Sequence, residues 1–180
     1  MSTPTLSDGS LTLETLAQIL DDHFQSNARD ITRFAGTGYS FEDWLNWEMF
    51  SAFTARGLKC FPKPAYKTHF AQTGVKTLGD VLVTTEGSNA WLIETSLVHG
   101  YTKDKWRTKI IADRDKLLRA DGGSVSKVQL VVLCSDCEQN LQEAWDYWFE
   151  AMPFWGLPDA QRSFTDGEQG EVCLLFWQIS

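Results

Sequence analysis

The stretch from Leu78 to Leu97 constrains the fold most, because two apolar runs in it are separated by a short polar turn. Val, Leu, Ile, Thr and Trp dominate both runs, and the turn over residues 86–89 reads Glu-Gly-Ser-Asn. Apolar runs on either side of a glycine-containing turn are typical of a β-hairpin. We therefore predict two antiparallel strands here, with the chain reversing at Gly87.

The predicted hairpin places two carboxylates opposite each other. If its arms are symmetric about Gly87, Asp80 lies directly across from Glu94, on the same face and with Cβ atoms roughly 5 Å apart. Like charges so placed are destabilising unless a cation lies between them. Two oxygen ligands on rigid strands suit a hard divalent ion. The pair therefore predicts a metal site, with Mg²⁺ or Mn²⁺ as the cofactor.

Helices and strands are also predicted on both sides of the hairpin. Apolar residues at helical spacing predict helices over about 11–25, 39–57, 104–119 and 138–152. Besides the hairpin arms, extended segments are predicted at about 58–61, 66–71, 125–134 and 171–180. A helix separates the second hairpin arm from the strand at 125–134, so these two strands should be parallel.

These elements predict an α/β fold of the α+β variety, with a central mixed sheet of about five strands and helices on both faces. The sheet would contain an antiparallel hairpin and a parallel crossover. With 180 residues, 43% of them hydrophobic, the chain suits a single domain over 1–180, with an N-terminal helical extension at about 1–36. No apolar stretch approaches the roughly 20 residues that span a bilayer, and residues 1–10 do not resemble a signal peptide. We therefore expect a cytoplasmic protein with no membrane partner.

Charge is distributed unevenly along the chain. The net charge is −8, but residues 1–55 carry −6, residues 56–127 carry +6 and residues 128–180 carry −8. Lysine and arginine supply most of the affinity of proteins for nucleic acid phosphates. The basic segment 56–127 includes both hairpin carboxylates, so it could attract nucleic acid to the predicted site. Alternatively, its lysines simply cover solvated faces.

A third carboxylate, Glu48, lies on the helix predicted over 39–57. Ser40 followed by Asp43 resembles a capping box, which would start this helix. Glu48 shares an apolar stripe with Trp44 and Leu45. A carboxylate on an apolar face costs free energy unless it is paired, hydrogen-bonded or bound to a metal. Glu48 is therefore a candidate third metal ligand.

The order of these features resembles the PD-(D/E)xK nuclease superfamily over about residues 40–133. The resemblance rests on Glu48 on a helix, Asp80 in the sequence GDVLV, and Glu94 in LIETS. A helix and a parallel strand follow them. In that superfamily, an acidic residue on the first core helix, an aspartate on the second strand and an acid-x-lysine on the third gather Mg²⁺. The resemblance implies that Glu48, Asp80 and Glu94 are metal ligands, and that the chain hydrolyses phosphodiester bonds.

The chain departs from the superfamily at Ser96, which stands where the motif has its lysine. A hydroxyl can hold a water but supplies no positive charge to the transition state. Lys105 and Lys109, one helical turn apart after the second hairpin strand, could bring an ammonium group to the same place, and Lys67 is a third candidate. With such a lysine, the hairpin carboxylates and Ser96 would be catalytic.

Without a relocated lysine, a protein of a different class is expected. It would be a catalytically inactive nuclease-fold protein that binds another protein, such as an inhibitor or immunity protein of a basic toxin. The acidic flanking segments favour this alternative, because negative charge attracts basic partners.

Cys134 and Cys137 lie between a predicted strand and a predicted helix, a setting that can lower a thiol pKa. A redox motif of the thioredoxin type follows an early strand, however, and no second cysteine pair completes a zinc site, so buried reduced thiols are expected.

An aromatic cluster occupies the C-terminal third, formed by Trp145, Tyr147, Trp148, Phe149, Phe154 and Trp155. One helix face cannot bury all of these side chains. Part of the cluster is therefore predicted to contact a partner protein, or a second copy of the chain in a homodimer.

Overall fold

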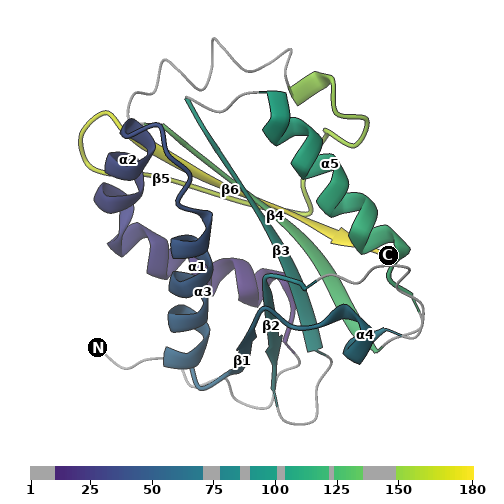
Figure 1. Cartoon of the computed structure of the whole chain (residues 1–180). Helices are drawn as coiled ribbons and strands as arrows, with labels where there is room; N and C mark the ends of the chain where they lie inside the picture. The colour runs from purple at the N-terminus through teal and green to yellow at the C-terminus, as the bar shows by residue number, and fades with distance from the viewer. Residues whose placement is uncertain (1–10, 71–77, 86–89, 101–103, 122–123, 136–148) are drawn as a thin grey trace.

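A computed structural model describes residues 11–70, 78–85, 90–100, 104–121, 124–135 and 149–180. These residues form a mixed sheet of six strands with helices on both faces (Figure 1). The predicted fold class is confirmed, with six strands rather than about five. Among the described residues, no helix is long and apolar enough to cross a membrane.

The elements have the following bounds. The helices are α1 (Leu13–Ser26), α2 (Ala28–Gly36), α3 (Glu42–Ala55), α4 (Tyr66–His69) and α5 (Asp104–Arg119). The strands are β1 (Lys59–Pro62), β2 (Val81–Thr84), β3 (Ala90–His99), β4 (Val125–Ser135), β5 (Ala160–Thr165) and β6 (Glu171–Ile179). Their order across the sheet is β1-β2-β3-β4-β6-β5.

The hairpin has the register predicted from the sequence. Strand β2 pairs antiparallel with β3, so that Val81 lies opposite Ile93 and Val83 opposite Trp91. This register is symmetric about position 87, and one further step brings Asp80 level with Glu94. Strand β4 runs parallel to β3 along its whole length, as the intervening helix α5 predicts.

Alternate strand residues face two separate cores. Helices α1, α2 and α3 cover one face of the sheet, and α5 covers the other (Figure 1). The strand residues beneath α1 to α3 include Val81, Val83, Trp91, Ile93 and Leu97. Those on the α4 and α5 side include Leu82, Leu92 and Val98. By the same alternation, Glu94 and Ser96 lie on the α5 side.

Two local predictions were wrong, and two elements were not predicted. Residues 66–69 form the helical turn α4 rather than a strand, because a single turn is too short to show helical periodicity. Phe41, not Ser40, is the N-cap of α3, and no side chain caps this helix. Helix α2, of nine residues, and the edge strand β5, of six, were not predicted, since each is short.

Two further predictions concern the segments 138–152 and 1–36. The helix predicted over 138–152 lies mostly outside the described residues. The N-terminal helices α1 and α2 belong to the larger of the two cores, with Leu16, Phe24 and Ile31 fully buried in it.

Candidate functional site

The site lies at the start of strand β2, where β3 continues beyond its last residue paired with β2. Beyond Ile93, the edge of β3 next to β2 has no further ladder partner among the described residues. Instead, the backbone N–H of Thr95 donates to Asp80 Oδ2 at 2.8 Å. The carbonyl oxygen of Thr95 accepts a hydrogen bond from Lys109 Nζ at 3.2 Å. Two charged side chains therefore take the place of a neighbouring strand.

Glu94, on β3, is at the centre of this site and is only 1% exposed. Tyr66 on α4 donates its hydroxyl hydrogen to Glu94 Oε1 at 2.6 Å. Lys116 on α5 donates to Glu94 Oε2 at 2.7 Å. The buried carboxylate thus has a partner at each oxygen, from elements far apart in the sequence.

Helix α5 presents a polar stripe to β3 through Lys109, Asp113 and Lys116, which lie at successive turns of one helix face. Lys109 Nζ is 2.7 Å from Asp113 Oδ2, and Lys116 Nζ is 3.3 Å from Asp113 Oδ1. The fully buried Ser96 donates its hydroxyl hydrogen to Asp113 Oδ2 at 3.2 Å. Asp113 therefore links the two lysines to β3.

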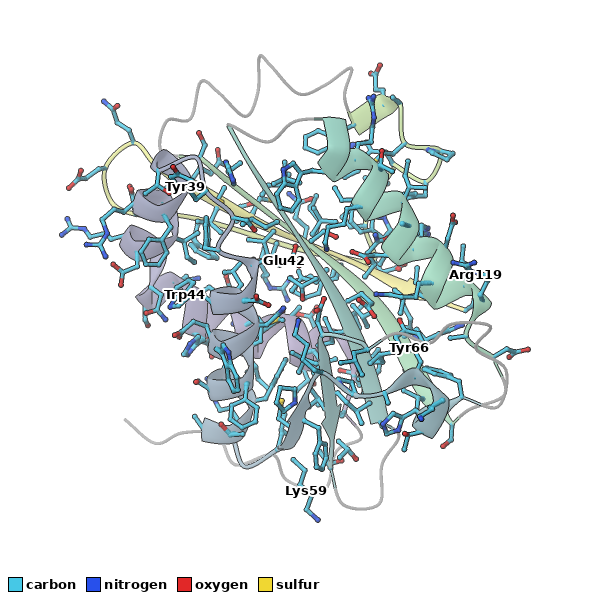
Figure 2. The ribbon with its side chains drawn as sticks, viewed as in Figure 1. Tyr39, Glu42, Trp44, Lys59, Tyr66 and Arg119 are labelled. Carbon is cyan, nitrogen blue, oxygen red and sulfur yellow. The ribbon has the colours of Figure 1, made fainter. Side chains whose placement is uncertain are left out.

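Glu42, in the first turn of α3, is the helix carboxylate that reaches this cluster. Its Oε2 lies 3.1 Å from Lys109 Nζ. In Figure 2 Glu42 is on the side of α3 that faces the sheet. Glu48, predicted as the helix ligand, instead meets His23 Nε2 of α1 at 2.7 Å. Six residues turn the two side chains about 120° apart on the helix, so they face different neighbours.

Asn46, one turn after Glu42, is 6% exposed, and neither its amide nitrogen nor its amide oxygen has a hydrogen-bond partner among the described residues. Glu42 Oε2, by contrast, is ion-paired with Lys109. Three residues beyond Asn46, the sulfur of Met49 accepts from Thr95 Oγ1 at 3.9 Å. Because buried polar groups are normally satisfied, this side of the cluster has spare hydrogen-bonding capacity.

Burial and mutual repulsion raise the pKa values of two acidic groups of the site, Glu94 and Glu42. Burial and the nearby Asp80 carboxylate raise the pKa of Glu94 to about 8, against the opposing influence of Lys116 and Tyr66. Burial also raises the pKa of Glu42, against the influence of Lys109. At neutral pH, Glu94 is therefore mainly protonated.

The pKa values of the basic groups Lys109 and Lys116 lie above their ordinary values. Burial works to lower the pKa of Lys109, but Glu42 and Asp113 outweigh it, so the pKa lies above its ordinary value. Lys116 behaves in the same way, with Glu94 and Asp113 as its partners. Both ammonium groups therefore stay charged and hold the cluster together.

The structure brings together most of the predicted site residues. Asp80, Glu94, Ser96 and Lys109 belong to one cluster. Glu48 does not join it. The side chain of Lys105 lies outside the described part of the structure, and Lys67 is exposed on α4.

Several members of the site were missed by sequence reasoning. They are Glu42, Lys63, Tyr66, Asp113 and Lys116. Asp113 and Lys116 carried a usable signal, since their spacing of four and seven residues from Lys109 places all three on one helix face.

The carboxylates of the cluster are ion-paired with lysines of the same cluster. Among the described residues, no three or more His, Cys, Asp or Glu side chains are arranged so that they could hold a metal ion. The basic segment contributes Lys63, Lys109 and Lys116 to the cluster, so part of its positive charge neutralises these carboxylates.

The cysteine and aromatic features have a structural role as far as they are described. Cys134 is buried on β4, and Cys137 lies outside the described residues. Phe149 stacks on Trp155 at 4.2 Å, and Trp155 contacts Trp177 of β6. These aromatic rings pack against the sheet, whereas residues 145–148 are not described. The predicted partner contact stays a prediction.

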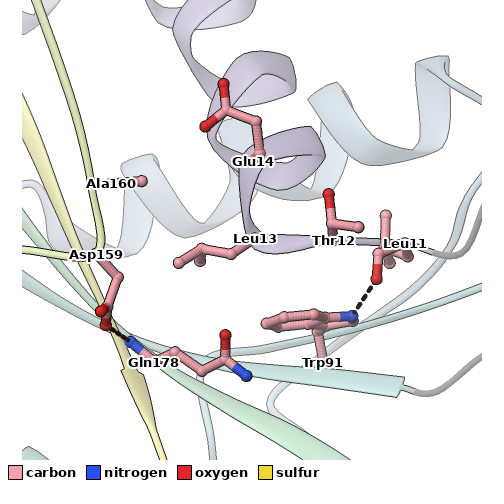
Figure 3. Close-up of a pocket in the computed structure, with 8 residues that line it drawn as sticks. All are labelled: Leu11, Thr12, Leu13, Glu14, Trp91, Asp159, Ala160 and Gln178. Atoms are coloured by element: carbon pink, nitrogen blue, oxygen red, sulfur yellow. Dashed lines mark hydrogen bonds between the residues drawn. The ribbon is translucent and has the colours of Figure 1, made fainter.

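A separate pocket of about 520 Å³ lies between the start of α1, Trp91 of β3 and the last two strands (Figure 3). Its carboxylates are already engaged. Asp159 Oδ2 accepts from the backbone N–H of Gln178 at 2.7 Å, and Glu14 is paired with Arg162. The Trp91 indole N–H donates to the carbonyl oxygen of Leu11 at 3.0 Å. This pocket offers no set of groups comparable to the cluster around Glu94.

Comparison with protein-family models, with curated proteins and with solved structures gives no match for this chain.

Proposed function

We propose that this chain is a divalent-metal-dependent phosphodiester hydrolase of the PD-(D/E)xK kind, acting on nucleic acid. The observation that carries the proposal is that Asp80, just before β2, lies level with Glu94 of β3, while Lys109 donates to the carbonyl oxygen of Thr95, the residue after Glu94. The element order supports it as well. Helix α3, three antiparallel strands, helix α5 and the parallel strand β4 follow one another as the resemblance implies.

The donor set fits Mg²⁺ or Mn²⁺ in one particular mode. Mg²⁺ is commonly held by one or two protein carboxylates, with water and substrate phosphate completing its shell. Asp80 and Glu94 can supply those carboxylates, and Glu42 Oε2, which is ion-paired with Lys109 at 3.1 Å, is a third oxygen nearby. Repulsion from Asp80 raises the pKa of Glu94, and a cation between the two would relieve this repulsion. Glu42 therefore replaces Glu48 as the proposed helix carboxylate.

Within this proposal, each group of the chain has a distinct task. A bound ion would lower the pKa of a water and polarise a phosphoryl oxygen. Lys109 supplies the positive charge that Ser96 cannot, and Asp113 holds its ammonium group in place. Because the Ser96 hydroxyl is buried and donates to Asp113, it orients this support and does not hold the water itself.

Protonation of Glu94 controls whether the site can bind a metal ion. A carboxylate must lose its proton to act as a ligand, so metal affinity depends on pH. With a pKa of about 8, Glu94 releases a proton when a cation enters. Tyr66 and Lys116 hold the ionised form in position through their hydrogen bonds to its two oxygens.

The test is nucleic acid cleavage with purified protein. Supercoiled plasmid, single-stranded DNA and RNA are incubated with Mg²⁺ or Mn²⁺ at pH 8.5, and products are followed on gels. We expect cleavage by the wild type, at least 100-fold slower cleavage by Glu94→Gln, and nearly normal cleavage by Glu48→Gln, since removal of one electrostatic group typically costs about 10²-fold or more. Equal activity in wild type and Glu94→Gln would point to a contaminating nuclease.

A second candidate function is a catalytically inactive, protein-binding domain. The observation that favours it is that lysines already neutralise Asp80, Glu94 and Asp113. A domain of this kind would bind no divalent ion and cleave none of the three substrates. It would instead bind a basic protein, with an affinity that falls as the salt concentration rises.

A further inference from the structure

Lys63 lies directly over Asp80 and was not among the residues singled out by the sequence. Its Nζ is 3.0 Å from Asp80 Oδ1 and 3.4 Å from Asp43 Oδ1. Its backbone N–H donates to the carbonyl oxygen of Asp80 at 2.9 Å, which ties the loop after β1 to the start of β2. The other oxygen of Asp80 is occupied by the N–H of Thr95. Lys63 is thus the cation at the one oxygen of Asp80 that a metal could use.

The backbone of Lys63 is strained. Its φ of 49° is the only positive φ at a non-glycine residue in the described part of the chain. The residue also precedes Pro64, a position that favours extended backbone. Pro62 on the other side restricts the loop further. A lysine persists in this conformation only where the surroundings fix it, and such strain is often concentrated at functional sites.

The three lysines of the cluster differ in how readily they can leave. The Lys116 side chain is 14% exposed and its partner Glu94 is 2% exposed, so separating this pair would leave a buried charge. Lys109 is 33% exposed and has three partners: Glu42, Asp113 and Thr95. Lys63 is 47% exposed. Solvent can therefore hydrate its ammonium group, but the Asp80 side chain is only 12% exposed, so another cation must replace the lysine when it leaves.

We infer that Lys63 is a displaceable counter-ion of Asp80, which keeps the site closed until a divalent cation replaces its ammonium group at Oδ1. This inference rests on the proposed function and concerns the regulation of the same site. Two positive charges cannot share one carboxylate oxygen without strong repulsion, so the lysine and the cation compete. The resting protein binds metal weakly because entry of the ion requires Lys63 to move into solvent.

The test measures Mn²⁺ binding by electron paramagnetic resonance, without any nucleic acid. The variant is Lys63→Asn, because asparagine tolerates positive φ and removes the charge. We expect its Mn²⁺ affinity to exceed that of the wild type about tenfold, since removing a like charge and a competing partner both favour the ion. Lys63→Arg should retain wild-type affinity because it keeps the counter-ion. In the double variant Lys63→Asn with Asp80→Asn, the gain should disappear.

Lys67→Asn is the matched control, because it removes the same charge from an exposed position four residues away. An equal gain in Lys67→Asn would show a general charge effect and overturn the inference. Equal affinity in Lys63→Asn and wild type, with binding still abolished by Asp80→Asn, would overturn the role of Lys63 and leave the proposed metal site intact. Absence of Mn²⁺ binding in every variant would overturn both. A gain in Lys63→Asn without nucleic acid cleavage would support the counter-ion and contradict the hydrolase.

Discussion

The Asp80 carboxylate accepts a hydrogen bond from the backbone N–H of Thr95 at 2.8 Å, just where β2 stops pairing with β3. A side chain thus continues the sheet edge, and the same side chain holds Lys63 through its other oxygen. Structural support and candidate chemistry therefore meet in a single residue.

This dual role predicts how Asp80 variants affect stability. Asp80→Ala should lower the free energy of unfolding by about 1–3 kcal/mol, because the buried N–H of Thr95 loses its acceptor. Asp80→Asn should cost less, since its amide oxygen can still accept that bond. Urea denaturation at pH 7 measures both, with the exposed Asp43→Ala as the control. Equal stability of Asp80→Ala and Asp43→Ala would contradict this account of the sheet edge.

Lys116 should be far more important for folding than an exposed lysine. At pH 9, where Glu94 is ionised in the wild type, Lys116→Met leaves this buried carboxylate without its cation, and breaking such a pair costs about 3–5 kcal/mol. Adding Glu94→Gln should restore much of the loss, because no buried charge then remains. Chemical denaturation of the two single variants and the double variant gives the coupling energy, with Lys67→Met as reference. Additive effects would show that the two side chains do not interact in solution.

The raised pKa of Glu94 predicts that the free energy of unfolding depends on pH. Its pKa of about 8 in the folded state lies above the ordinary value of 4.5, so the folded chain holds a proton that the unfolded chain releases between these pH values. The contribution of Glu94 is therefore fully present below about pH 4.5 and is lost as the pH rises through 8. Its slope is at most about 1.4 kcal/mol per pH unit. Comparing unfolding free energies of wild type and Glu94→Gln from pH 5 to 9 measures it, and parallel curves would refute the raised pKa.

Glu42 and Glu48 can be distinguished by metal binding. We expect Glu42→Gln to weaken Mn²⁺ affinity about tenfold or more, because this carboxylate faces the cluster across Lys109. Glu48→Gln should leave the affinity unchanged, since it meets His23 on α1. Calorimetric titration at pH 8.5 measures both variants. The opposite ranking would return the helix ligand to Glu48.

The sequence predicted those parts of the site that follow from strand periodicity. The symmetry of the two apolar runs about Gly87 placed Asp80 level with Glu94, because side chains in a hairpin alternate with a fixed period of two. The position of Lys109 also followed, since α5 starts immediately after β3. Packing across the sheet was not needed for either prediction.

The remaining residues depend on tertiary packing that periodicity does not encode. Glu42 and Glu48 are both acidic residues on α3, and only the position of this helix against α1 and the sheet decides which faces the cluster. Lys63 lies between two prolines in the loop after β1, and Tyr66 is the first residue of the single-turn helix α4. Their contacts with Asp80 and Glu94 arise from loop geometry, and no spacing rule predicts them.

The response of thermal stability to divalent ions tests the central claim most directly. At pH 8.5, where Glu94 is largely ionised, 10 mM Mg²⁺ or Mn²⁺ should raise the melting temperature of the wild type by about 5 °C or more, a shift typical of a ligand well above its Kd. Asp80→Asn, verified as folded by circular dichroism, should show no such shift. A flat response in the wild type, or an equal shift in Asp80→Asn, would contradict a metal site at Asp80 and Glu94.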